Sequence, residues 1–138
     1  KFKIGKGLIL KDGKEFAILG VGTALSIAKE CVGLLNKKNI DAELISFHTP
    51  KPLDSKLLNS LFKLKKLIII IEEHGLIGGA GSAILEWANI TKNDASKVLR
   101  FGGPDKFLTG CGNQKQARKL IGLESKNIVS KILDHLKK

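Results

Sequence analysis

One unbroken apolar run, Leu67–Ile71, constrains the fold of this chain more than any other segment. Five consecutive aliphatic residues suit a strand that is buried on both faces, as in a parallel sheet covered by helices. Glu72, Glu73 and His74 follow the run, and a glycine-rich loop comes next. In open α/β sheets, ligands and partners usually meet the molecule beyond the carboxyl ends of the strands. The sequence therefore predicts a candidate site at residues 72–82.

Strand-like and helix-like segments alternate along the chain and predict its fold class. The apolar pattern indicates helices that begin near residues 24, 55, 79, 113 and 125, and strands at 7–10, 15–19, 41–48, 67–71 and 97–101. Strands that are connected through helices favour a mostly parallel sheet covered on both faces. The link that contains Asp12-Gly13 is hairpin-like, which predicts one antiparallel strand beside the parallel sheet.

Several helix starts carry a residue suited to an N-cap. Asp54 or Ser55, then Asn113, then Ser125 are placed to accept hydrogen bonds from free N–H groups of a first turn. Gly122 is expected to end the helix that begins at Asn113.

The two cysteines, Cys31 and Cys111, are too few for a disulfide scaffold or a metal cage. Cys31 falls on the apolar face of a predicted helix, so it is expected to pack as a small hydrophobic residue. Cys111 lies between two glycines in a predicted loop and is a candidate reactive thiol.

The charge of the chain is strongly positive, with a formal net charge of +11. Nearly all of this charge is lysine, and Arg100 and Arg118 are the only arginines of the sequence. Arginine is the preferred residue for reading bases and phosphates, and the chain has no tyrosine for base stacking. The composition therefore favours a solvated lysine surface over a nucleic-acid interface.

Length and hydropathy predict a single domain, residues 1–138, in the cytoplasm. No apolar run approaches the ~18 residues that cross a membrane, and the first residues lack the apolar segment of a signal peptide. The sequence starts at Lys1 and contains no methionine, so we expect it to be part of a longer polypeptide.

A glycine turn at residues 20–24 suggests a second candidate site. Gly20, Gly22 and Thr23 follow a predicted strand and open a helix, as in a dinucleotide-binding fingerprint, but Leu25 stands where the third glycine would be. The alternatives are a tight strand-to-helix turn and an anion site on the amino end of the helix.

More than one role is compatible with residues 72–82 and with the loop after the fifth strand. Histidine is a residue type suited to acid–base chemistry, which makes His74 a candidate. Glu72 and Glu73, however, point to opposite sides if the strand continues. An interface, or a role in holding the loop, is therefore favoured over a catalytic role. The loop glycines, including Gly78 and Gly79, suit a phosphate cradle or close packing, without the lysine of a P-loop. Asp105 would lie at the same edge and cap a turn.

Taken in order, these motifs resemble the C-terminal domain of the transketolase family. The resemblance covers about the whole chain and rests on the ordered set of Gly20-Val21-Gly22-Thr23, Pro50-Lys51-Pro52-Leu53-Asp54, Glu72-Glu73-His74, Gly78-Gly79-Ala80-Gly81-Ser82, Pro104-Asp105-Lys106-Phe107 and Gly122-Leu123. It implies a three-layer α/β/α fold with a five-stranded, mostly parallel mixed sheet in which one strand is antiparallel.

The resemblance also implies a parent enzyme that depends on thiamine diphosphate and Mg²⁺. In that family the cofactor lies between a pyrophosphate-binding and a pyrimidine-binding domain, and the C-terminal domain packs on the latter and supports the dimer. This sequence lacks the Gly-Asp-Gly segment followed by Asn-Asn that would hold the metal diphosphate. The expectation is therefore that this domain binds neither cofactor nor metal by itself and carries no catalytic residue. Glu73, His74, Gly78, Gly79, Gly22, Thr23 and Asp105 are its candidate channel, interface or phosphate-proximal residues.

Within the family, the sequence motifs favour a transketolase that moves a two-carbon ketol unit between sugar phosphates. Residues 107–110, Phe-Leu-Thr-Gly, lack the histidine-glycine pair common at this place in deoxyxylulose-phosphate synthase. That synthase remains an alternative, as does a regulatory module that binds a nucleotide or another phosphate. The chain is expected to be either a cut fragment or a split subunit of the larger enzyme.

Overall fold

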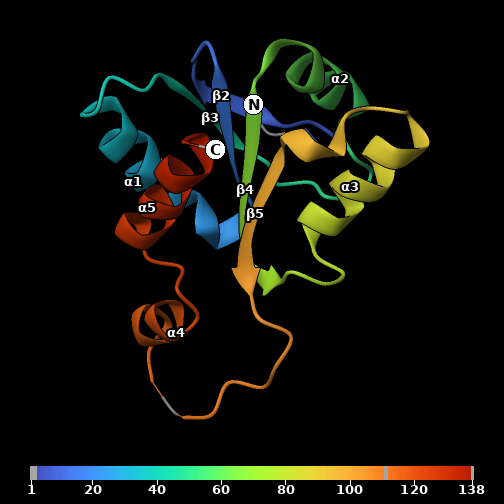
Figure 1. Ribbon diagram of the computed structural model, residues 1–138. Helices are drawn as coiled ribbons and strands as arrows, with labels where there is room; N and C mark the ends of the chain where they lie inside the picture. Colours follow the sequence, from blue (N-terminus) through green and yellow to red (C-terminus); the bar gives the residue numbers. More distant parts are fainter. Residues whose placement is uncertain (1–2, 111, 138) are drawn as a thin grey trace.

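The fold is built on one five-stranded sheet in the order β1-β3-β2-β4-β5 (Figure 1). The computed structural model describes residues 3–110 and 112–137. Strands β2 to β5 run parallel to one another, and β1 pairs antiparallel with β3 at the edge. The strands are β1 (Leu8–Lys11), β2 (Phe16–Gly20), β3 (Ala42–Ser46), β4 (Leu67–Gly75) and β5 (Val98–Gly103).

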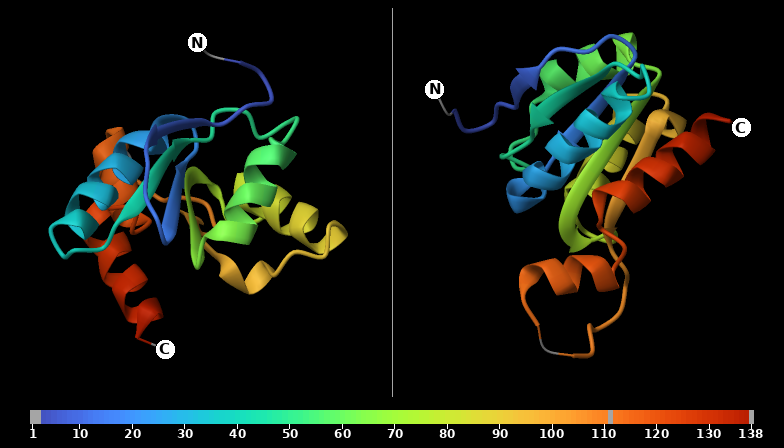
Figure 2. Two further views of the ribbon diagram at one scale, coloured as in Figure 1. Left: turned by 90° about the horizontal axis from the view of Figure 1, so that it is seen from above. Right: turned by 90° about the vertical axis from the view of Figure 1, so that its left-hand side faces the viewer.

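Helices cover both faces of this sheet (Figures 1 and 2). Helices α1 (Leu25–Asn36) and α5 (Ser125–Leu136) pack on one face, while α2 (Ser55–Leu64) and α3 (Ala80–Ile90) pack on the other. Helix α4 (Gln114–Leu120) lies outside these layers, beyond the carboxyl ends of β4 and β5. Short 3₁₀ turns, η1 (Gly22–Ala24) and η2 (Ala95–Lys97), complete the secondary structure. The expected three-layer α/β/α fold is confirmed.

The apolar run in β4 forms the centre of the core. All five residues of Leu67–Ile71 are buried. Ile69 and Ile71 pack toward α1 and α5, whereas Ile68 and Ile70 pack toward α2 and α3. Burial of one such side chain contributes roughly 1.5–3 kcal/mol. A strand with two apolar faces therefore requires a helix layer on each side.

The structure differs from the predicted strand arrangement at two points. Strand β4 continues to Gly75, so Glu72, Glu73 and His74 belong to the strand and do not follow it. The predicted antiparallel strand is confirmed as β1, but β1 pairs with β3, so the hairpin-like link between β1 and β2 does not join two paired strands. Both edges of β2 are taken by the parallel strands β3 and β4, so β1 can join only at an outer edge of the sheet, and it pairs with β3.

The helix caps agree with the sequence at two of three positions. Asp54 caps α2 and accepts from the Leu57 amide at 3.2 Å, and Asn113 caps α4 in a capping box with Gln116. Ser125 is the first residue of α5, since Glu124 holds the N-cap position, so that prediction is wrong. The predicted helix end near Gly122 is close: α4 ends at Leu120, and Gly122 has a φ of +76°.

Cys31 is buried in α1 as predicted, and burial raises the pKa of its thiol to about 12. Cys111 lies outside the described residues. Within the described part of the chain, every helix is too short or too polar to cross a membrane.

Candidate functional site

The carboxyl end of β4 sends two neighbouring carboxylates to opposite sides of the sheet. Side chains alternate along a strand, and β4 continues through both residues. Glu72 reaches the start of α3, while Glu73 reaches η1 and α4. The two carboxylates therefore belong to separate clusters, as the sequence predicted for a continuing strand.

Glu72 is a buried group that holds the amino end of α3. The residue is only 1% exposed. Its carboxylate accepts hydrogen bonds from the backbone amides of Ala80 at 2.6 Å and Gly81 at 2.9 Å. A Cβ at Gly79 would lie 2.7 Å from the carboxyl carbon of Glu72, so glycine is needed there. A negative group at a helix amino end is stabilised by free N–H groups and the helix dipole. The amides that a phosphate would need are thus already used.

The loop after β4 is held by a second set of contacts. Arg100, from β5, donates to the Leu76 carbonyl at 2.8 Å and to the Ser82 hydroxyl at 3.1 Å. The same hydroxyl donates to the Leu76 carbonyl at 2.8 Å and accepts from the Gly78 amide at 3.1 Å. Gly78 has a φ of +77°, which favours glycine at this turn. The sequence analysis included Ser82 in the stretch 72–82 without a role of its own, and it missed Arg100, although an arginine inside an otherwise apolar strand was an available signal.

Glu73 joins three segments that are far apart in the sequence. Its carboxylate accepts from the Thr23 hydroxyl, from Nε of Arg118 and, at 3.1 and 3.2 Å, from the Gln114 amide. Arg118 also donates to the Thr23 carbonyl at 3.1 Å. Partial burial acts to raise the pKa of Glu73, but the hydrogen bonds from Thr23 and Arg118 and the Arg118 charge outweigh it and lower that pKa. Gln114 and Arg118 were not predicted, though Arg118 is one of two arginines.

The structure brings only some of the predicted residues together. Gly22, with a φ of +56°, and Thr23 lie in η1 beside Glu73, whereas Gly78 and Gly79 lie on the Glu72 side. His74 is exposed, and its Nδ1 is 3.0 Å from the Gly75 carbonyl oxygen. Asp105 is exposed in the loop after β5. These residues share one end of the sheet but do not converge on one point.

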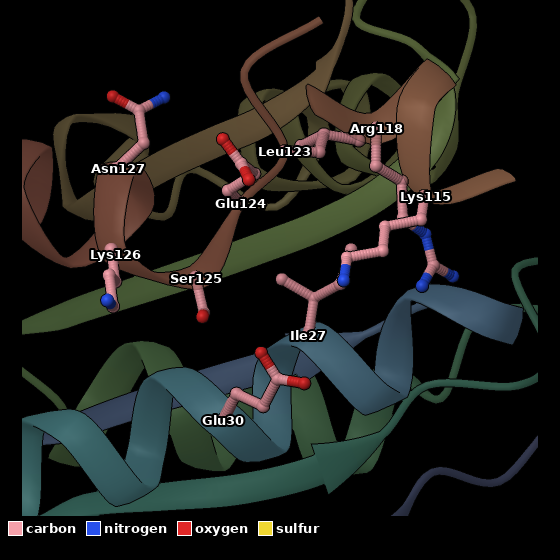
Figure 3. Close-up of a pocket in the computed structure, with 9 residues that line it drawn as sticks. All are labelled: Ile27, Glu30, Lys115, Arg118, Leu123, Glu124, Ser125, Lys126 and Asn127. Carbon is pink, nitrogen blue, oxygen red and sulfur yellow. The ribbon is translucent and has the colours of Figure 1, made fainter. Parts of the chain in front are cut away.

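A cavity of about 700 Å³ lies beside this end, between α1, α4 and the start of α5 (Figure 3). Lys115 and Arg118 from α4 and Lys126 from α5 line it, together with the carboxylates Glu30 and Glu124. Arg118 connects this cavity to Glu73. Three basic side chains and two carboxylates line the cavity, so it carries a small excess of positive charge.

The described residues do not make a site for a magnesium diphosphate. Within residues 3–110 and 112–137, no three His, Cys, Asp or Glu side chains are grouped as a metal site. The α3 amides face Glu72, and Glu73 places negative charge at η1. No step of a cofactor reaction is therefore assigned to this chain's residues.

Sequence comparison identifies relatives that are named either as deoxyxylulose-phosphate synthases or as a transketolase C-terminal section. Residues 5–128 match the model of the transketolase C-terminal domain. The 1-deoxy-D-xylulose-5-phosphate synthase of Geobacillus is 36% identical over 132 residues, which are 96% of this chain and 21% of that protein. A sequence from Methanocaldococcus jannaschii, provisionally named a transketolase C-terminal section, is 33% identical over 99% of this chain and 42% of its own length. The chain thus spans about a fifth of the synthase.

Structural comparison agrees with this assignment. A split-gene transketolase, described as an inactive β4 tetramer, superposes with a TM-score of 0.87 at 28% identity, over 99% of this chain and 44% of that one. Campylobacter jejuni transketolase superposes with a TM-score of 0.64 at 17% identity, over 94% of this chain and 18% of that one, and supports the fold alone. The family model, the sequence relatives and the shared fold together show that this chain belongs to the transketolase family, as a C-terminal domain.

Proposed function

We propose that this chain is the C-terminal domain of a thiamine-diphosphate-dependent transferase and serves it as a scaffold without catalytic residues of its own. One observation carries the proposal: both carboxylates at the end of β4 are engaged with the chain itself. Glu72 holds α3, and Glu73 holds η1 and α4. Neither is left as a free acid or base. Glu73, His74, Gly78, Gly79, Gly22, Thr23 and Asp105 are proposed as residues of an interface or channel wall.

The remaining parts of the enzyme would lie on other domains. The chain spans 21% of the Geobacillus synthase and 42% of the Methanocaldococcus sequence. We infer that pyrophosphate- and pyrimidine-binding domains, on the same chain or another subunit, bind thiamine diphosphate and Mg²⁺. Residues 1–138 would form one domain that packs on the pyrimidine-binding domain and supports a homodimer.

The proposed reaction is transfer of a two-carbon ketol unit between sugar phosphates. The likeness to a split-gene transketolase over 99% of this chain supports it. The alternative, synthesis of 1-deoxy-D-xylulose 5-phosphate, is supported by the 36% identity to the Geobacillus synthase. The full enzyme should be assayed for both reactions with thiamine diphosphate and Mg²⁺. Exchange between sugar phosphates without deoxyxylulose phosphate supports the first reaction, and the reverse result supports the second.

The scaffold role has its own test. Isothermal titration of the 138-residue chain with thiamine diphosphate and Mg²⁺ should give no heat of binding, with the full enzyme as the positive control. Binding at micromolar concentration would contradict the role proposed here.

A regulatory phosphate site is the second candidate, and the cavity near Arg118 is the observation that favours it. Lys115, Arg118 and Lys126 line a space of about 700 Å³. A ligand that binds only the folded chain raises its melting temperature, and the rise grows with the ligand concentration relative to Kd. Nucleotides and sugar phosphates at millimolar concentration should then raise Tm in the native chain but less in Lys115→Ala. No shift with any of these ligands counts against this candidate.

A further inference from the structure

Among the described residues, helix α4 and the loop before it contribute no side chain to the core. None of the seven residues of α4 is buried, and residues 104–110 are exposed or only half-buried. We call residues 104–110 and α4 the arm. In Figures 1 and 2 the arm projects past the end of the sheet, away from the helix layers. Its order therefore does not come from burial within this chain.

The arm is nevertheless held in a defined position. Asn113 and Gln116 form a capping box at the start of α4, and Glu73 binds Gln114 and Arg118. Arg118 further donates to the Thr23 carbonyl at 3.1 Å. These contacts orient α4 against the carboxyl end of β4. A helix of seven residues has little stability alone, so such anchoring is needed to present its surface.

The arm carries both exposed apolar side chains and basic side chains. Phe107 is 97% exposed and Leu120 is 70% exposed, and Leu108 is also exposed. Residues 104–121 contain Lys106, Lys115, Arg118 and Lys119 against a single carboxylate, Asp105. Exposed large apolar side chains with a charged rim are typical of protein interfaces, and a phenylalanine is a suitable anchor.

We propose that the arm is the docking surface through which this domain binds the rest of its enzyme, at an apolar patch rimmed by Asp and Glu. The inference rests on the proposed function, because it takes the missing domains as the partner. Charge favours this partner over the arm of a second copy: residues 104–121 carry four basic side chains against one carboxylate, so two such arms would repel each other. An acidic rim would instead complement the lysines.

Photo-crosslinking in the full enzyme tests the proposal. The phenylalanine analogue p-benzoylphenylalanine is placed at position 107, and in a control enzyme at position 90. Ile90 is a matched control because it is 79% exposed, at the end of α3 away from the arm. The probe at 107 should crosslink to a segment outside this domain that is rich in Asp and Glu, and the probe at 90 should not.

Charge reversal adds a second readout. Lys115→Glu with Lys119→Glu should cause loss of the crosslink from position 107. The control, Lys37→Glu with Lys38→Glu, makes the same change in net charge at the far end of α1 and should leave it intact. A crosslink to the arm of a second copy, an equal yield from position 90, or no crosslink would overturn the proposal. If the crosslink forms in an enzyme without ketol transfer, the proposed function fails while the docking surface stands.

Discussion

The carboxylate of Glu72 lies 2.6 Å from the backbone nitrogen of Ala80, so the last buried part of β4 directly holds the first turn of α3. The strand and the helix are joined by a buried ionisable side chain at the end of the sheet where open α/β folds usually bind ligands. A buried carboxylate that loses its hydrogen-bond partners keeps the free-energy cost of desolvation without compensation. Substitutions that break this contact should therefore lower the free energy of unfolding by a measurable amount.

Gly79→Ala should destabilise the chain. The new Cβ would overlap the Glu72 carboxyl group, 2.7 Å from its carbon, and push it away from the α3 amides. We expect a loss of about 2–4 kcal/mol in the free energy of unfolding in urea. Gly33→Ala is the control: nothing lies within 4 Å of its Cβ position in α1, so it should stabilise by about 0.5–1 kcal/mol. Equal effects from the two substitutions would contradict the assigned contact.

Glu72→Gln should lower the free energy of unfolding by about 1–3 kcal/mol, because one carboxylate oxygen becomes an NH₂ that cannot accept from a backbone amide. Chemical denaturation at neutral pH measures the difference. Glu86→Gln, on the exposed side of α3, should change it by less than about 0.5 kcal/mol. A harmless Glu72→Gln would show that Glu72 does not hold the helix as a carboxylate.

The Glu73 contacts should make stability depend on pH. The pKa of Glu73 is lowered below the ordinary value of 4.5, so its stabilisation is fully present above that pH. The contribution is lost as the pH falls through the lower, folded-state pKa, because the neutral form binds Arg118 less well. The unfolding free energy of the native chain minus that of Glu73→Gln should be about 1 kcal/mol at pH 7 and shrink toward pH 3.

Asp134→Asn is the control for this experiment. It breaks the exposed pair with Lys137 at 3.3 Å and should change stability by less than about 0.5 kcal/mol. A pH-independent difference for Glu73→Gln would rule out a stabilising charge on Glu73.

Cys31 should resist alkylation while the chain is folded. Only the thiolate reacts, and burial raises the pKa of this thiol to about 12, so the thiolate is scarce at pH 8. Iodoacetamide labelling followed by peptide mapping should show Cys31 unmodified in buffer and fully modified in urea. Rapid labelling of Cys31 in the native chain would mean that α1 separates from α5 readily.

The fold could be predicted from the sequence because its signals are local. The run Leu67–Ile71 required two apolar faces, the alternation of segments indicated a parallel sheet, and Asp54 and Asn113 marked helix starts. The pairing of the strands was harder to predict from the sequence. The position of β1 beside β3 depends on which sheet edge is free, and that follows from the whole topology.

The candidate site shows the same division. The sequence by itself determined that Glu72 and Glu73 follow a buried strand and, by alternation, face opposite sides if that strand continues. Only the tertiary structure decided that it does continue, that Glu72 meets the α3 amides, and that Arg118 arrives at Glu73 from 45 residues further along the chain. The physical reason is the sequence separation of the interacting residues. Periodicity depends on residues that are neighbours along the chain, whereas the hydrogen-bond partners of a carboxylate come from distant elements that packing brings beside it.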